Sequence, residues 1–139
     1  MNETKYFTLA ELLQSNTALT KQIPNLPTWQ QVENLNRLVS TILDPVRERF
    51  GKPIKVTSGF RSAKLNTAVG GVGNSQHKQG LAADLQANDL SALKSAILTA
   101  NVPFDQLIEE HKGKTTWLHV SAAAEDKTPR KQVLTITIK

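Results

Sequence analysis

The sequence predicts an α+β fold in which N-terminal helices pack on one side of a mostly antiparallel sheet. Two patterns carry this prediction. The apolar positions between Val32 and Val46 follow the three- and four-residue spacing of an amphipathic helix. The segment Val133–Ile138 instead alternates with the two-residue period of a strand. Because the helical patterns come first and the strand patterns cluster later, helices and strands segregate along the chain, as they do in α+β domains.

Two capping boxes indicate where the first two helices begin. They are Thr8 with Glu11 and Thr28 with Gln31, and a loop containing Pro24 and Pro27 separates them. Pro45 is expected to kink the second helix or to restart it, since proline lacks a backbone N–H and clashes with the preceding turn. This helix is expected to stop at Gly51–Pro53.

The rest of the chain alternates short strands with loops and one further clear helix. Residues 58–76 are rich in glycine, serine and asparagine, which predicts a loop around a short helix at 62–68. A helix is expected over Asp89–Ala100, because its leucines and isoleucine share one side. The remaining strand candidates are Ile54–Thr57, Ala82–Leu85, Phe104–Glu110 and Thr116–Ser121.

The length and composition limit the classes of protein and of site. A chain of 139 residues is close to one average domain, so one domain is expected over residues 1–139. No apolar run approaches the roughly 18 residues that a membrane span needs. The absence of cysteine excludes disulfide frameworks, thiol nucleophiles and iron–sulfur clusters. Any metal must therefore be bound by Asp, Glu and the three histidines, His77, His111 and His119.

The charge balance favours an anionic partner. Seventeen Lys and Arg against twelve Asp and Glu give a net charge of +5, which suits nucleic acid, acidic lipid or an acidic wall polymer. The basic residues are scattered and no recognition helix or aromatic platform emerges, so nucleic acid is not expected. The opening Met1–Tyr6 lacks the basic and apolar regions of a secretory signal peptide, which predicts synthesis in the cytoplasm without one.

Two histidines and one aspartate are candidate metal ligands. His77 and Asp84 lie seven residues apart with a glycine between them, and His119 falls in a strand candidate. Two imidazoles and a carboxylate, with a fourth position open, make a catalytic zinc site. The spacing alone does not bring them together, so His77 also suits a surface loop and His119 a half-buried strand position. His111 is expected in a solvated turn.

Ordered motifs between residues 57 and 121 point to a family. They are Thr57–Ser62, Asn66, Gly70–Gly71, Ser75–Asp84 with Gly80 and Ala82 inside it, Phe104–Glu110 and Trp117–Ser121. The stretches Tyr6–Leu12 and Leu43–Pro53 precede them. Together they resemble the zinc D-Ala-D-Ala carboxypeptidase family, in its phage and bacterial peptidoglycan metallopeptidase branch. The resemblance implies a hedgehog/DD-peptidase-like fold, which related signalling proteins share.

The resemblance also implies a role for each matched residue. It assigns three ligands to Zn2+: His77, Asp84 and His119. Glu110 matches the general base, which takes a proton from water and passes it to the leaving amine. Arg61 matches the cation that binds the scissile carbonyl and stabilises the oxyanion. Ser75 matches a small polar residue that helps to hold the substrate's terminal carboxylate.

One position departs from the family pattern. Several branches carry an acid three residues before the last ligand, where this sequence has Thr116, so the base must come from the neighbouring strand. Strand alternation sends Glu109 and Glu110 to opposite faces, and apolar residues fall on both faces. Periodicity therefore leaves the choice open, and the motif alignment favours Glu110. The basic insert His111–Lys114 is expected in a rim loop that touches anionic wall.

The resemblance implies a zinc peptidase that hydrolyses D-alanine-containing bonds of peptidoglycan stem peptides. A carboxypeptidase and an endolysin-type endopeptidase, of phage or bacterial origin, both fit this description. We expect a monomer that binds neither nucleic acid nor a membrane and that reaches the wall after release by other means. The alternative is a non-catalytic cell-wall-binding module, because a fold does not fix a function.

Overall fold

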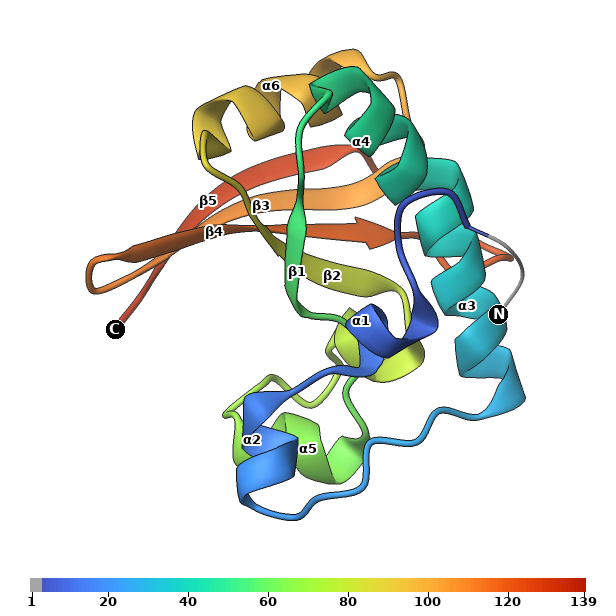
Figure 1. Cartoon of the computed structure of the whole chain (residues 1–139), viewed down its shortest axis with the longest axis vertical. Coiled ribbons are helices and arrows are strands. Elements are labelled where there is room, and N and C mark those ends of the chain that lie inside the picture. Colours follow the sequence, from blue (N-terminus) through green and yellow to red (C-terminus); the bar gives the residue numbers. More distant parts are fainter. Residues whose placement is uncertain (1–3) are drawn as a thin grey trace.

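The computed structural model describes residues 4–139. Residues 1–3, which belong to the segment Met1–Tyr6 that was compared with a signal peptide, lie outside this range. The described part of the chain contains six α-helices, one π-helical turn, one 3₁₀ turn and one sheet (Figure 1). The helices are α1 (Leu9–Leu13), α2 (Asn16–Thr20), α3 (Trp29–Leu38), α4 (Asp44–Phe50), α5 (Ala63–Ala68) and α6 (Leu90–Thr99). The turns are the π-helical η1 (Val39–Leu43) and the 3₁₀ turn η2 (Gln76–Gln79). The strands are β1 (Lys55–Ser58), β2 (Ala82–Gln86), β3 (Phe104–Lys112), β4 (Thr115–Ala122) and β5 (Gln132–Ile138).

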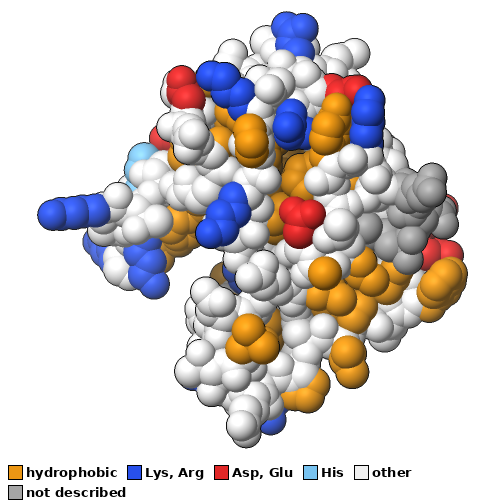
Figure 2. Space-filling model, in the orientation of Figure 1, with side chains coloured by type: hydrophobic (Ala, Val, Ile, Leu, Met, Phe, Trp, Pro, Cys, Tyr) orange, Lys and Arg blue, Asp and Glu red, His pale blue; other side chains and the backbone are white. Residues whose placement is uncertain are grey.

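The sheet confirms the predicted α+β class. Its strand order is β1-β2-β4-β3-β5, and every neighbouring pair is antiparallel except β3 with β5, which is parallel. The end of the β3–β4 hairpin and the end of β5 project together as an arm, residues 109–117 and 135–138 (Figures 1 and 2). No helix described here has the length and apolar composition that a bilayer crossing requires.

The long amphipathic helix begins at the predicted cap and is interrupted at the predicted proline. The Thr28 hydroxyl accepts from the Gln31 N–H, and the Gln31 side chain accepts from the Thr28 N–H. Before Pro45, the Asp44 N–H donates to the carbonyl of Val39, five residues back, which is the spacing of a π-turn. This wider turn makes room for the Pro45 ring, which would clash with the preceding turn of an unbroken α-helix. The α-helical structure resumes there as α4.

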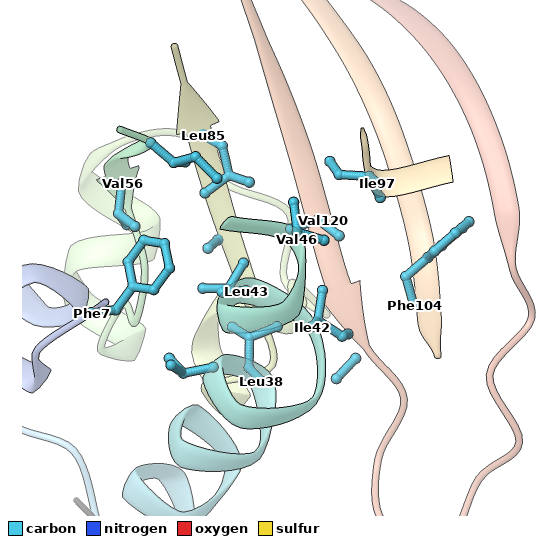
Figure 3. Packing of buried hydrophobic residues seen from close by; sticks show 14 of the residues in the cluster. Phe7, Leu38, Ile42, Leu43, Val46, Val56, Leu85, Ile97, Phe104 and Val120 are labelled. Carbon is cyan, nitrogen blue, oxygen red and sulfur yellow. The ribbon is translucent and has the colours of Figure 1, made fainter. Parts of the chain in front are cut away.

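The main core lies between the sheet and the helix layer of α3, η1, α4 and α6 (Figure 3). Its labelled side chains, all buried, are Phe7, Leu38, Ile42, Leu43, Val46, Val56, Leu85, Ile97, Phe104 and Val120. Burying one such side chain stabilises the fold by roughly 1.5–3 kcal/mol. Since strand side chains alternate, the neighbours of core residues Leu85 and Val120, namely Asp84 and His119, point to the opposite face of the sheet.

The sequence did not predict α2, whose residues fall in the expected loop region. The Ser15 hydroxyl caps this helix by accepting from the Ala18 N–H. Its one buried residue, Ala18, packs with Ile23 and Leu65 in a small second cluster beside α5. A five-residue helix with a single buried position has no apolar periodicity to detect.

Candidate metal centre

Three side chains from separate elements meet on the face of the sheet that the helix layer leaves uncovered. His77 lies on η2, Asp84 on β2 and His119 on β4, where Asp84 and His119 are direct cross-strand partners. The Asp84 Oδ1 lies 3.3 Å from the His77 Nε2 and 3.2 Å from the His119 Nδ1. All three residues are buried, and one nitrogen or oxygen from each lies within 4.8 Å of the others. These residues could together hold a metal ion.

A hydrogen bond to the backbone of Gly59 fixes the orientation of the His77 ring. Its Nδ1 lies 2.7 Å from the carbonyl oxygen of Gly59, so a proton on Nδ1 donates to that oxygen and leaves Nε2 facing Asp84. Metal-binding histidines are commonly oriented by such a bond from the second ring nitrogen. The bond depends on close backbone contact, since a Cβ at Gly59 would lie 2.4 Å from the carbonyl oxygen of Leu12.

The turn that carries His77 is closed at both ends. The Ser75 hydroxyl accepts from the His77 N–H at 3.2 Å and caps η2, while Ser75 also lines the cavity described below. At the other end Gly80 takes a left-handed conformation with φ 75°, and a Cβ there would lie 2.6 Å from the Gln31 carbonyl oxygen. Glycine is therefore required where the chain passes helix α3 into β2.

The Asp84 carboxyl remains ionised despite its burial. Burial acts to raise the pKa of Asp84, but the charge and hydrogen bonds of His77 and His119 outweigh burial and hold that pKa well below its usual range. The guanidinium of Arg61 adds a contact of 3.3 Å between its Nη2 and the Asp84 Oδ2. The Asp84 carboxylate is therefore already in the deprotonated form in which it binds a cation.

Arg61 is held next to the three candidate ligands by two further polar side chains. Its Nε donates to the Ser58 hydroxyl at 3.0 Å, and its Nη1 donates to the Asn66 Oδ1 at 3.3 Å. Asn66 is buried and donates in turn to the carbonyl of Val72 at 2.8 Å. Asn66 belongs to the ordered sequence motifs, which predict no role for it. The only sequence feature that could have indicated the contact is the position of Asn66, five residues after Arg61 within the ordered motifs.

Glu109 and Glu110 point to opposite faces of β3, as alternation predicts. The Glu110 Oε1 lies 4.0 Å from the His119 Nδ1, on the face of the candidate ligands. Burial, together with the negative charge of Asp84, raises the pKa of the Glu110 carboxyl. Glu109 faces α6, where its carboxylate contacts the Lys94 Nζ at 3.3 Å and the His111 Nε2 at 2.7 Å. The hydrogen bond from His111 lowers the pKa of Glu109.

The prediction that His111 lies in a solvated turn is wrong. β3 continues through Lys112, and the chain turns only at Gly113, where φ is 60°. The His111 ring is half-buried between Glu109 and the Thr116 hydroxyl, which lies 3.0 Å from its Nδ1. This pairing extends the strand beyond the predicted end, so only the tip of the basic insert forms a turn.

A cavity of about 680 Å³ opens over the three candidate ligands. Of the residues that the sequence analysis selected, it is lined by Arg61, Ser75, His77, Asp84, Glu110 and His119. Figure 2 shows the hollow as a cleft between the arm and the part of the molecule that holds α2 and α5. The structure thus brings every predicted site residue to one cavity, and the role of each is proposed below.

Comparison with known proteins decides the family. Residues 5–121 match the family described as Peptidase M15, which covers most of the chain. The chain belongs to the peptidase M15 family. It is also similar to the zinc D-Ala-D-Ala carboxypeptidase of Streptomyces albus G, with 40% identity over 67 residues. That match covers 48% of this chain and 26% of the relative, so the chain matches about a quarter of the relative's length.

In this M15 family member, the three candidate ligands lie within the matched residues, whereas β5 lies outside them. The resemblance predicted from the ordered motifs is confirmed. β5 nevertheless contributes to the same cavity, because Ile136 and Ile138 line it together with Arg130 from the preceding segment. One wall of the cavity is therefore made by residues that the family match does not include.

Proposed function

We propose that this chain is a zinc-dependent peptidase that hydrolyses D-alanine-containing bonds of peptidoglycan stem peptides. The convergence of His77, Asp84 and His119 within 4.8 Å, in a chain of a peptidase family, carries the proposal. Two imidazole nitrogens and one carboxylate oxygen are a ligand set that zinc takes in catalytic sites. The bond from the His77 Nδ1 to Gly59 supplies the outer support that such a set needs.

These three residues would hold the ion, and all three line the cavity. When bound, Zn2+ supplies a Lewis acid that polarises a carbonyl oxygen and makes water more acidic. The residues around it would orient the peptide and move protons. No thiolate competes for the metal, since the chain has no cysteine.

Glu110 is the proposed general base. Its carboxylate faces the candidate ligands from the neighbouring strand and lines the cavity, so it can accept a proton from the attacking water and return it to the leaving amine. Burial raises the pKa of the Glu110 carboxyl. Its pKa therefore lies closer to the working pH than that of a fully solvated carboxyl, which suits a group that both accepts and returns a proton.

Arg61 and Ser75 are the proposed substrate-binding groups. The guanidinium of Arg61 is fixed by Ser58 and Asn66 before any substrate arrives, so it can meet the negative charge that develops on the scissile carbonyl oxygen. The Ser75 hydroxyl lies beside His77 in the cavity wall, which supports a contact with the substrate's terminal carboxylate. The printed name of the Streptomyces relative, a D-Ala-D-Ala carboxypeptidase, supports D-alanine as the recognised residue.

Two forms of the proposal differ in the bond that is cut. A carboxypeptidase would release one terminal residue, and a phage endolysin-type endopeptidase would cut inside a stem peptide or cross-link. In both forms we propose a monomer that acts on the wall and binds neither nucleic acid nor a membrane. Mass spectrometry of the products from a panel of defined stem peptides separates the two forms.

Metal removal tests the proposal as a whole. The chain loaded with one zinc per molecule should cleave a D-alanine-containing peptide, lose this activity on exhaustive chelation and regain it when zinc is added back. Asp84→Asn serves as the matched variant, since it keeps the side-chain size but removes the charge, and it should bind zinc weakly. Undiminished activity after complete zinc removal would contradict the metal mechanism. Wall binding without any cleavage by the zinc-loaded chain would favour the non-catalytic binding module.

A further inference from the structure

The face of the sheet that carries the candidate ligands continues outward as three rows of side chains. The first row holds His119 with its β3 partner Ile108, and the second holds Trp117 with Glu110. The third row holds Lys112 of β3. Because every second strand residue faces the same side, Ile108, Glu110 and Lys112 lie in line along β3, and all three line the cavity.

Lys112 differs from the other cations of this cavity. Arg61 is paired with Asp84, and Arg130 donates to both carboxylate oxygens of Asp105 at 3.0 and 2.7 Å. Within residues 4–139, no carboxylate oxygen lies within 4.0 Å of the Lys112 ammonium group. The outer end of the cavity thus carries a positive charge that the described part of the protein leaves uncompensated.

β5 gives this outer end an apolar wall. Ile136 lies opposite Glu110 in the parallel register and Ile138 lies opposite Lys112. Both isoleucines line the cavity, and Ile136 is 41% exposed. Figure 2 shows basic side chains on the arm beside the cleft, and the lysines of the arm are Lys112 and Lys114. A cation beside the two isoleucines that line the cavity fits a ligand with an apolar stem and an anionic end.

We propose that Lys112, Ile136 and Ile138 form a subsite for a free carboxylate of the peptide substrate, on the leaving-group side of the scissile bond. This inference rests on the proposed function. Glu110 in the middle row would give its proton to the leaving amine, so the leaving part of the peptide lies over that row and continues toward Lys112.

The register sets the distance of this carboxylate from the bond that is cut. Lys112 follows Ile108, the partner of His119, by four strand residues, which corresponds to about 13 Å along the strand. An extended peptide covers this length in about four residues, and the long lysine side chain shortens the gap. The subsite therefore suits a carboxylate two to four residues beyond the scissile bond, that is, a leaving group longer than one residue.

Four peptides with a common acyl part ending in D-Ala test this inference. The leaving group is D-Ala or D-Ala-Gly-Gly, and each ends in a carboxylate or a carboxamide. The zinc-loaded chain should prefer the carboxylate form of the longer leaving group by about five- to tenfold in kcat/KM, the range of a charge-assisted contact at a partly open site. In Lys112→Met this ratio should fall to near one through a rise in KM for the carboxylate form. Lys112→Arg should keep the preference.

Lys114→Met is the matched control, since Lys114 lies at the tip of the same hairpin, is exposed and does not line the cavity. It should keep the wild-type ratio. The inference is overturned if Lys112→Met affects carboxylate and carboxamide peptides equally, changes neither, or affects only the one-residue leaving group. If the zinc-loaded wild type cleaves none of the four peptides, the proposed function itself fails, and the subsite fails with it.

Discussion

Glu109 and Glu110 are adjacent in β3, but their carboxylates have different surroundings. Glu110 faces His119 and the cavity, whereas Glu109 forms an ion pair with Lys94 and a hydrogen bond with His111 on the other face. Burial raises the pKa of Glu110, while the hydrogen bond from His111 lowers that of Glu109. The two residues therefore offer a matched pair of substitutions in which only one removes a carboxylate from the site.

Glu110→Gln should lower kcat by about 10²- to 10⁴-fold, the usual contribution of a general base, while zinc content stays at one per chain. Glu109→Gln should leave kcat within a few-fold of the wild type, since that carboxylate does not face the cavity. Steady-state kinetics and metal analysis of both variants check the prediction. A large loss of kcat in Glu109→Gln with a small one in Glu110→Gln would reverse the assignment of the base.

The position of Arg61 depends on a glycine that the sequence motif contains but does not explain. A Cβ at Gly71 would lie 2.2 Å from the Asn66 Oδ1 and 3.1 Å from the Arg61 Nη1. Neither atom can stay where it is if Gly71 gains a methyl group. Gly73, two residues later, has nothing within 4 Å of the same added atom and does not have a positive φ.

Gly71→Ala should therefore displace Asn66 and Arg61 and lower kcat/KM by about 10- to 100-fold, because a misplaced cation meets the developing charge poorly. Gly73→Ala should behave as the wild type. Kinetics of both variants at equal zinc content, with circular dichroism to verify folding, provide the measurement. Equal activity of the two variants would show that Asn66 does not position Arg61.

At the scale of the elements, the interrupted helix also anchors the N-terminal segment. Asp44, the first residue of α4, accepts from the backbone N–H of Lys5 at 2.8 Å and of Tyr6 at 3.1 Å. The Tyr6 ring packs on the main core, with the Arg47 guanidinium 4.8 Å from its centre. The side chain at the π-turn thus joins two segments that are nearly forty residues apart.

Asp44→Ala should lower the free energy of unfolding by about 1–3 kcal/mol, since it leaves two backbone donors without their charged acceptor. Glu48→Gln, which removes an exposed ion pair between Glu48 and Lys5, should change it much less. Urea titrations of the zinc-loaded proteins compare the two. The proposed anchoring role of Asp44 is wrong if both substitutions cost the same.

Elements whose signal is local could be predicted, whereas those set by distant contacts could not. The capping boxes at Thr8 and Thr28 are confirmed, because each depends only on residues three positions apart. The alternation of Val133–Ile138 predicts a strand but contains no information on its neighbour, so the parallel pairing with β3 emerges only in three dimensions. Similarly, alternation separates Glu109 from Glu110, but the side that each one faces depends on where α6 packs.

At the scale of the whole molecule, Asp105 joins the site to the segment that leads into β5. It is buried at the start of β3 and accepts three hydrogen bonds from Arg130, one of them from the backbone N–H. It also accepts from the Gln76 amide at 3.0 Å, and Gln76 directly precedes His77. One carboxylate therefore links the sheet, the turn that carries a candidate ligand and the chain beyond the family match.

The same contacts predict how stability depends on pH. The hydrogen bonds from Arg130 hold the pKa of Asp105 at about 2, below the ordinary 3.8 of an unfolded aspartate. Because the folded state binds fewer protons here, this contribution is fully present above about pH 4 and is lost as the pH falls from there toward 2. It amounts to about 1–2 kcal/mol, since water around the exposed Arg130 weakens the pair.

Asp105→Asn cannot titrate, so its free energy of unfolding should fall less steeply than that of the wild type between pH 5 and pH 3. Arg130→Gln should also flatten the profile, because without its partner the Asp105 pKa returns toward its ordinary value. Urea titrations of the three metal-free proteins across this range isolate the effect, since Asp84 and the other acids titrate alike in all of them. If the free energies of unfolding of all three proteins fall in parallel with pH, the pKa of Asp105 in the folded protein is ordinary. Acid would then destabilise the fold through carboxylates other than Asp105, which joins β5 to the site.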